Sequence, residues 1–150
     1  MNPDEPSADI VRAGLTFSWR YSHGLGALAP FFAALTQGRA LATQCPSCRT
    51  TWFPPRMTCP DHGPLAQWRE LAGVGTVMTV TRTTLSLPLT GRGAAAVMAL
   101  IAMDGASNLV VGRIAGAMDA EPGARVRLAV DAGATVHPIQ SMVFEIVGGR

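Results

Sequence analysis

Residues 45–62 read CPSCRTTWFPPRMTCPDH, and this stretch holds all three cysteines of the chain and one of its three histidines. Cys45 and Cys48 form a Cys-x2-Cys pair, and Cys59 and His62 repeat the spacing with an imidazole in the last place. The two thiolates of such a turn can reach one tetrahedral ion. A closed set of three sulfurs and one nitrogen suits zinc. The stretch therefore predicts a zinc ribbon with these four residues as ligands.

Two other interpretations of these residues stay open. A Cys-x2-Cys pair can be a redox dithiol, but such a pair usually begins a helix, whereas Pro46 and Arg49 indicate a turn into a strand. Asp61 is the nearest rival of His62 as the fourth ligand. A closed site leaves no coordination position for water, so we expect the metal to hold the fold together and not to catalyse.

The composition of residues 40–70 agrees with a structural metal. The segment has few aliphatic side chains and cannot build a core of its own, so it needs a cross-link such as a bound metal ion. The chain begins MNPDEPSAD, which lacks the layout of a signal peptide, and apolar runs such as 94–103 are too short to span a bilayer. We therefore expect a cytoplasmic protein without a membrane partner, whose reduced thiols bind metal and form no disulfide.

The residues before the ribbon predict little regular structure except one helix. We expect residues 1–14 to be a flexible leader and residues 15–39 to contain an extended arm and a short amphipathic helix. The helix should run from about Pro30, which suits a first helical turn, to Gln37, with Gly38 as the residue that ends it.

From residue 71 to residue 150 the pattern is that of β-strands. Val and Thr alternate, or apolar residues run together, between turns that contain glycine. Five such strands with no long helix between them predict a small Greek-key barrel of the OB type. The expected fold class is thus mainly β: a helix, a zinc ribbon over residues 40–70 and a five-stranded OB-fold. The predicted strands are Gly75–Leu85, Ala94–Met103, Leu109–Ile114, Arg125–Val130 and Met142–Val147.

The sequence offers no catalytic centre outside the four ligands. The serines lack a nucleophile-elbow context and the ten acids are scattered. The glycines at 24–26 and 91–93 lack the downstream pattern of a phosphate-binding loop. Arg92 is a loop tip that could alternatively contact a CoA phosphate, and His23 and His137 are best explained as surface residues. The net charge of +2, with all twelve basic residues Arg, gives no bulk argument for nucleic acid.

Three segments, in order, resemble a known family. A helix runs into the first knuckle (FFAALTQGRALATQC, 31–45), an aromatic-Pro-Pro-Arg string leads to the second (TWFPPRMTCP, 51–60), and a Trp and a Gly-x-Gly lead into the first barrel strand (QWRELAGVGTVMTVT, 67–81). The later strands fit more loosely, and the match covers roughly 15–148. The chain thus resembles the zinc-ribbon/OB-fold acyl-CoA-associated proteins, long catalogued as a domain of unknown function.

The resemblance implies a rubredoxin-like ribbon before the OB-fold, and a particular kind of function. Members of this family act as partner subunits of thiolase-like enzymes, namely acetyl-CoA acetyltransferases, sterol-carrier-type thiolases and side-chain aldolases, and support an acyl-CoA channel. The catalytic residues belong to the partner, so this chain would be a non-catalytic subunit that holds structural zinc and meets acyl-CoA through the complex. The sequence departs from the family at His62, where Cys is usual, which changes the charge of the site by one unit.

Aromatic and Arg side chains, the usual anchors of protein interfaces, are concentrated in the first third of the chain. The alternative is that the rings cover the small ribbon core. For Trp19 and Tyr21 no local core is in reach, which favours an interface. The candidate partner-contacting residues are Trp19, Tyr21, Phe31, Phe32, Trp52, Phe53 and Arg56.

Two other functions compete with the accessory subunit. The chain could be a free-standing acyl-CoA-binding protein or minor enzyme. It could also be an OB module for single-stranded nucleic acid, but such modules need aromatic stacking platforms and a basic groove. The predicted strands 94–103 and 109–114 contain no aromatic residue and only Arg113, so nucleic acid is the weaker of these alternatives.

Overall fold

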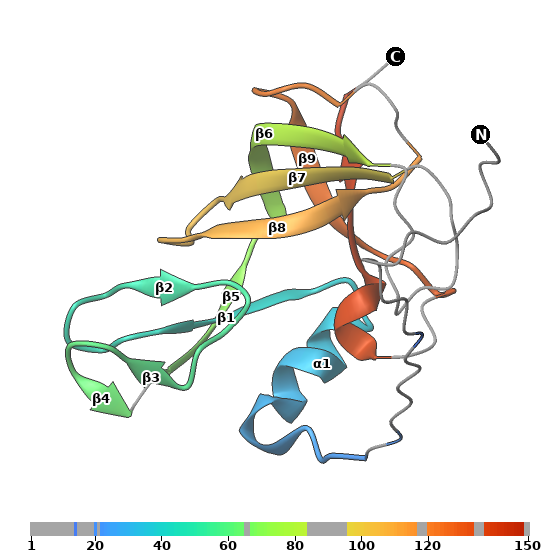
Figure 1. Cartoon of the computed structure of the whole chain (residues 1–150). Helices are drawn as coiled ribbons and strands as arrows, with labels where there is room; N and C mark the ends of the chain where they lie inside the picture. Colours follow the sequence, from blue (N-terminus) through green and yellow to red (C-terminus); the bar gives the residue numbers. More distant parts are fainter. Residues whose placement is uncertain are drawn as a thin grey trace, which may run out of the picture.

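The computed structural model describes residues 14, 20, 22–64, 67–83, 96–116, 120–133 and 137–148 (Figure 1). The leader expected before residue 14 and the candidate residues Trp19, Tyr21 and Arg92 lie outside the described residues. Within the described ranges, no helix is long and apolar enough to cross a membrane.

One short helix precedes the ribbon, as the sequence predicts. A 3-10 turn, η1 (Gly26–Leu28), leads into α1 (Ala29–Leu35). Gly38 adopts a left-handed φ of 73° and donates its N–H to the carbonyl of Leu35 at 2.9 Å. This tight i to i+3 closure ends the helix two residues before the predicted Gln37.

The ribbon consists of two small antiparallel sheets. The first has the strand order β2-β1-β5, in which β1 (Ala40–Gln44) lies between β2 (Thr51–Trp52) and β5 (Gln67–Leu71). The second pairs β3 (Thr58–Cys59) with β4 (Gly63–Pro64). The pairing of β5 with β1 brings residues that are about thirty positions apart into register, for example Ala40 opposite Leu71.

The rest of the chain forms a closed five-stranded barrel of the predicted OB type. Its strand order is β10-β8-β7-β6-β9, and β6 pairs with β9 to close it. The pairing of β10 with β8 is parallel and the others are antiparallel. The 3-10 turn η2 (Pro138–Ser141) precedes the last strand. The strands are β6 (Val74–Thr83), β7 (Ala96–Met103), β8 (Leu109–Ile114), β9 (Arg125–Val130) and β10 (Met142–Ile146).

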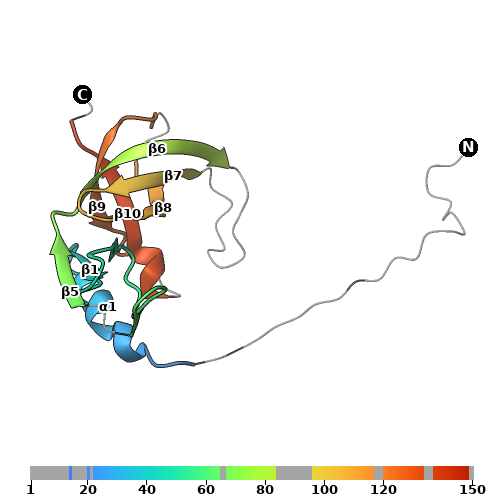
Figure 2. The ribbon, with the colours of Figure 1, turned by 90° about the vertical axis from the view of Figure 1, so that its left-hand side faces the viewer.

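The barrel, α1 and the inner side of the ribbon share one apolar core. Phe144 is fully buried, and a Cβ at position 112 would lie 2.3 Å from its ring, so only glycine fits β8 at that position. Phe31 on α1 packs edge-on against Phe53 of the ribbon, with ring centroids 6.1 Å apart. Both rings belong to the same buried cluster as the barrel residues. Figure 2 shows α1 and the ribbon gathered at one end of the barrel, where β5 leads into β6.

The loop between β7 and β8 ties the ribbon to the barrel with hydrogen bonds. The Asn108 side-chain amide accepts the N–H of Phe53 and donates to its carbonyl, both at 2.9 Å. Beside it, Ser107 donates its N–H to the Thr51 carbonyl at 2.7 Å, and its hydroxyl accepts the Thr51 N–H at 3.0 Å. The loop therefore continues the ribbon sheet along the outer edge of β2.

We expect Asn108→Ala to lower the free energy of unfolding by about 1–3 kcal/mol, because both backbone groups of the buried Phe53 lose their partner. Denaturant unfolding followed by tryptophan fluorescence measures the loss. Thr36→Ala is the control, since the Thr36 hydroxyl bonds only to a carbonyl of its own turn. If Asn108→Ala is as stable as Thr36→Ala, this tie does not stabilise the fold.

Candidate metal centre

Two tight turns bring the four predicted ligands together. Cys45 follows β1, and two hydrogen bonds close its turn. The Cys45 N–H donates to the Thr50 carbonyl at 2.9 Å, and the Arg49 N–H donates to the Cys45 carbonyl at 3.0 Å. Arg49 sits at a φ of 63°, which a non-glycine residue rarely adopts outside such turns. In the second turn Cys59 ends β3 and His62 comes just before β4.

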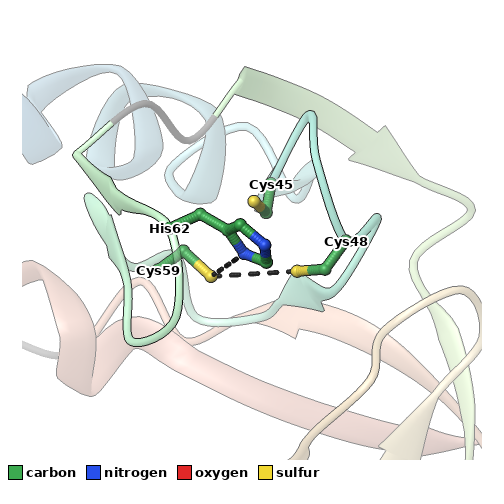
Figure 3. Close-up of side chains that lie close together, drawn as sticks. All are labelled: Cys45, Cys48, Cys59 and His62. Atoms are coloured by element: carbon green, nitrogen blue, oxygen red, sulfur yellow. Dashed lines mark hydrogen bonds between the residues drawn. The ribbon is translucent and has the colours of Figure 1, made fainter.

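The four ligand atoms converge on one point (Figure 3). The Sγ atoms of Cys45, Cys48 and Cys59 and a ring nitrogen of His62 all lie within 4.8 Å of one another. Within the described part of the chain, this is the one such grouping of three or more His, Cys, Asp or Glu side chains. Asp61, the rival fourth ligand, is exposed and does not belong to it.

The separations fit a tetrahedral ion held by sulfur and nitrogen. Two thiolates bound to one such ion lie about 3.8 Å apart, and a thiolate and an imidazole nitrogen lie about 3.5 Å apart, given ordinary zinc bond lengths. The distance from Cys48 Sγ to Cys59 Sγ is 3.8 Å, and that from Cys59 Sγ to His62 Nδ1 is 3.5 Å. The donor set therefore fits zinc, with Nδ1 as the histidine atom that faces the sulfurs.

The cysteines differ in exposure and in acidity. Cys45 and Cys59 are buried beside Trp52, whereas Cys48 is exposed. The Thr50 hydroxyl lies 3.2 Å from Cys48 Sγ, and hydrogen bonds from Thr50 to the thiolate lower the pKa of Cys48 to about 6. Burial raises the pKa of Cys59. The exposed Cys48 thiol therefore loses its proton readily near neutral pH, as metal binding requires. A cation beside the buried Cys59 would favour its thiolate against the effect of burial.

The structure places the other predicted site residues differently. Phe31, Phe32, Trp52 and Phe53 are at most 9% exposed, so, contrary to our expectation, these rings are buried and not available to a partner. The three phenylalanines lie in the shared core, and Trp52 packs beside Cys45 and Cys59. Local sequence does not reveal that α1 and the ribbon share the core of the barrel. Of the predicted interface residues that the structure describes, only Arg56 is exposed.

Two further aromatic features were not fully anticipated. Trp68 of β5 is 36% exposed, although sequence reasoning used it only as a marker of the family. His23 is exposed as predicted, but His137 is only half-exposed, because it stacks on His23 with ring centroids 5.4 Å apart and meets the ring of Phe32 edge-on. Its Nδ1 accepts the Ile139 N–H at 3.2 Å.

Comparison with known proteins covers both parts of the chain. Residues 32–61 match the family described as "ChsH2, rubredoxin-like zinc ribbon domain", and residues 68–131 match "ChsH2, C-terminal OB-fold domain". Together these matches span the end of α1, the first ribbon turn, the second turn up to the residue before His62, and four barrel strands. A search of curated proteins gave no match.

Two solved structures are similar to this chain. An "Ltp2-ChsH2(DUF35) aldolase" aligns with a TM-score of 0.62 and 25% sequence identity, covering 85% of this chain and 98% of that one. A DUF35-family protein of unknown function from Sulfolobus solfataricus aligns with a TM-score of 0.56 and 15% identity, covering 79% of this chain and 83% of that one. The second likeness shows the shared fold.

We expect the purified chain to hold one zinc ion per molecule, and His62→Ala to lower its affinity for zinc, because one of the four ligand atoms is removed. Elemental analysis and competition with a chromogenic chelator measure both. His62→Cys should retain the metal, and His23→Ala, which changes a histidine outside the cluster, should behave as wild type. A wild-type chain without stoichiometric zinc would contradict the assignment.

Thr50→Val should make the zinc-loaded chain lose metal at a higher pH. The hydroxyl favours the Cys48 thiolate, so without it the pKa rises and protons compete with the ion sooner as the pH falls. An acid titration with a zinc indicator gives the midpoint. Thr58→Val is the control, since Thr58 is an exposed strand residue of the ribbon beside Cys59. An unchanged midpoint for Thr50→Val would show that the hydroxyl does not set this acidity.

Proposed function

Because this chain belongs to the DUF35 family of zinc-ribbon and OB-fold proteins, we propose that it is a non-catalytic subunit of a thiolase-like enzyme and supports acyl-CoA chemistry carried out by that partner. The observation that carries the proposal is the likeness to the Ltp2-ChsH2(DUF35) aldolase, which covers 98% of that chain and runs through ribbon and barrel alike. The partner class is an acetyl-CoA acetyltransferase, a sterol-carrier-type thiolase or an aldolase.

The chemistry of the described residues supports an accessory role. The four-ligand cluster is a closed donor set, and a metal there supplies a structural cross-link and no site for water. Among the described residues, Glu70, Asp104, Asp131 and Glu145 each form an ion pair with an arginine, as in Arg39–Glu70 at 2.7 Å. We assign the reacting nucleophile and base to the partner.

In this proposal the residues of the chain position surfaces and leave the reacting atoms to the partner. Cys45, Cys48, Cys59 and His62 would hold zinc and thereby fix the two ribbon turns. Asn108 and the shared core then fix the ribbon on the barrel. A rigid two-part surface of this kind suits a subunit that bridges or shapes a partner's channel.

Coexpression with a thiolase-superfamily enzyme of the same genome tests the proposal. With an affinity tag on the enzyme, we expect this chain to copurify in a fixed stoichiometry and to raise the soluble yield or activity of the enzyme. Cys45→Ser should abolish copurification by releasing the ribbon turns, and His23→Ala should not. A chain that runs alone and leaves the enzyme unchanged contradicts the proposal.

Calorimetry with CoA on the isolated chain separates the first alternative. Weak or absent binding agrees with an accessory subunit, whereas tight binding by the chain alone identifies a free-standing acyl-CoA binder. A salt-dependent shift with single-stranded oligonucleotide would instead favour the nucleic-acid module.

A further inference from the structure

The outside of the barrel is divided into a charged part and an uncharged part. On β9 and β10 the outward side chains form ion pairs: Arg127 lies opposite Glu145 in register and 3.3 Å from its carboxylate. At the start of the same strand, Arg125 pairs with Asp104 at 2.6 Å. This part has the pattern of a solvated sheet face.

The neighbouring strands β6, β7 and β8 have a different outer side. Cross-strand register places Leu100 opposite Val111 and Ala102 opposite Leu109, while the residues between them point inward and are buried. Val111 is 61% exposed and Leu109 is 45% exposed. We call this the uncharged face, and its members are Thr76, Met78, Thr79, Thr81, Met98, Leu100, Ala102, Leu109 and Val111.

Among the described residues of these strands, charged side chains lie at the rim of the uncharged face, and the exposed Arg82 of β6, next to Thr81, is one of them. At one end Arg113, opposite Met98, is neutralised by an ion pair with Asp131. At the other end Arg125 reaches Thr76 at 2.8 Å as well as Asp104. An apolar centre with a charged rim is the usual anatomy of a protein interface, because charged groups are depleted where water is excluded.

The shape and chemistry of the uncharged face favour a protein partner. It lies on the outside of a closed barrel, which is convex, whereas small-molecule sites are concave. Its members include no aromatic ring on which a base could stack. A partner that met it with an unpaired charge would have to bury that charge without a counterion, so the complementary surface is itself uncharged and apolar.

The uncharged face adjoins the ribbon. Leu109 directly follows Asn108, whose amide holds the Phe53 backbone, and Figure 1 shows β8 beside β2. The exposed apolar side chains form a narrow strip, while a stable interface needs about 800 Å² on each partner. An enzyme subunit that covers the strip and continues over the adjoining ribbon would add the ribbon surface to this contact area.

We propose that the uncharged face is the docking surface for the partner enzyme, which meets it with an uncharged apolar patch. This inference rests on the proposed function, in which the partner is a separate thiolase-like subunit. Val111, the most exposed apolar side chain of the face, lies at the centre of the contact, and Leu109 carries the contact toward the ribbon.

The test uses the full chain coexpressed with a tagged thiolase-superfamily enzyme of the same genome. Val111→Asp should weaken the complex by about tenfold to a hundredfold, because it buries an unpaired charge at the centre of the contact. Val111→Thr, nearly the same in shape, should weaken it less. Val147→Asp is the matched control, since Val147 is a 46% exposed valine outside the face, and its complex should form as in wild type. Unfolding midpoints confirm that the variants fold.

The outcomes separate the two claims. If the wild-type complex forms and Val111→Asp binds like Val147→Asp, the docking surface is refuted while the proposed function stands. If the wild type forms no complex, the proposed function fails and the docking surface with it. If light scattering instead shows a homodimer that Val111→Asp dissociates, a second copy occupies the face and the assignment to the enzyme is overturned.

Discussion

The fold of the ribbon depends on four ligand atoms that lie within 4.8 Å of one another in a segment that has little else to pack. Its two turns contain proline, threonine and exposed polar side chains, and the apolar cluster beside the ligand atoms consists of Cys45, Cys59 and Trp52 alone. Such a cluster is far too small to offset the conformational entropy of ordering about twenty residues. A metal ion held by these atoms, which lie at the separations of a tetrahedral site, would supply the cross-link that apolar packing does not.

The ordered ribbon is then joined to the barrel in two ways. Phe31 and Phe53 enter the same core as the barrel residues, so α1 and the ribbon lose their apolar contacts if they separate from it. Asn108 satisfies both backbone groups of Phe53, which fixes the register of the loop against the ribbon. Apolar packing stabilises the contact between the two parts, and the Asn108 amide aligns them.

A ribbon packed and hydrogen-bonded onto the barrel in this way is consistent with an accessory subunit, which contributes surfaces to a partner. Of the rings that sequence reasoning placed at an interface, those within the described residues are buried. The exposed apolar side chains include Leu109 and Val111 of β8 and Met78 of β6. The docking surface that we propose therefore lies on the outer side of the barrel and not in the first third of the chain. There the separation of charged strands from uncharged ones distinguishes a solvated surface from one suited to a partner.

The sequence alone determined the ligand spacing, the helix and the five barrel strands, because each depends on short-range patterns: paired Cys-x2 turns, Pro30 and Gly38, and alternating Val and Thr. Only the tertiary structure decided which residues are buried. Strand β5 forms by pairing with β1, the Asn108 tie joins residues 55 positions apart, and the exposure of Val111 depends on which way β8 faces in the closed barrel. Local patterns do not encode these contacts, since each needs a partner that chain closure brings near from far along the sequence.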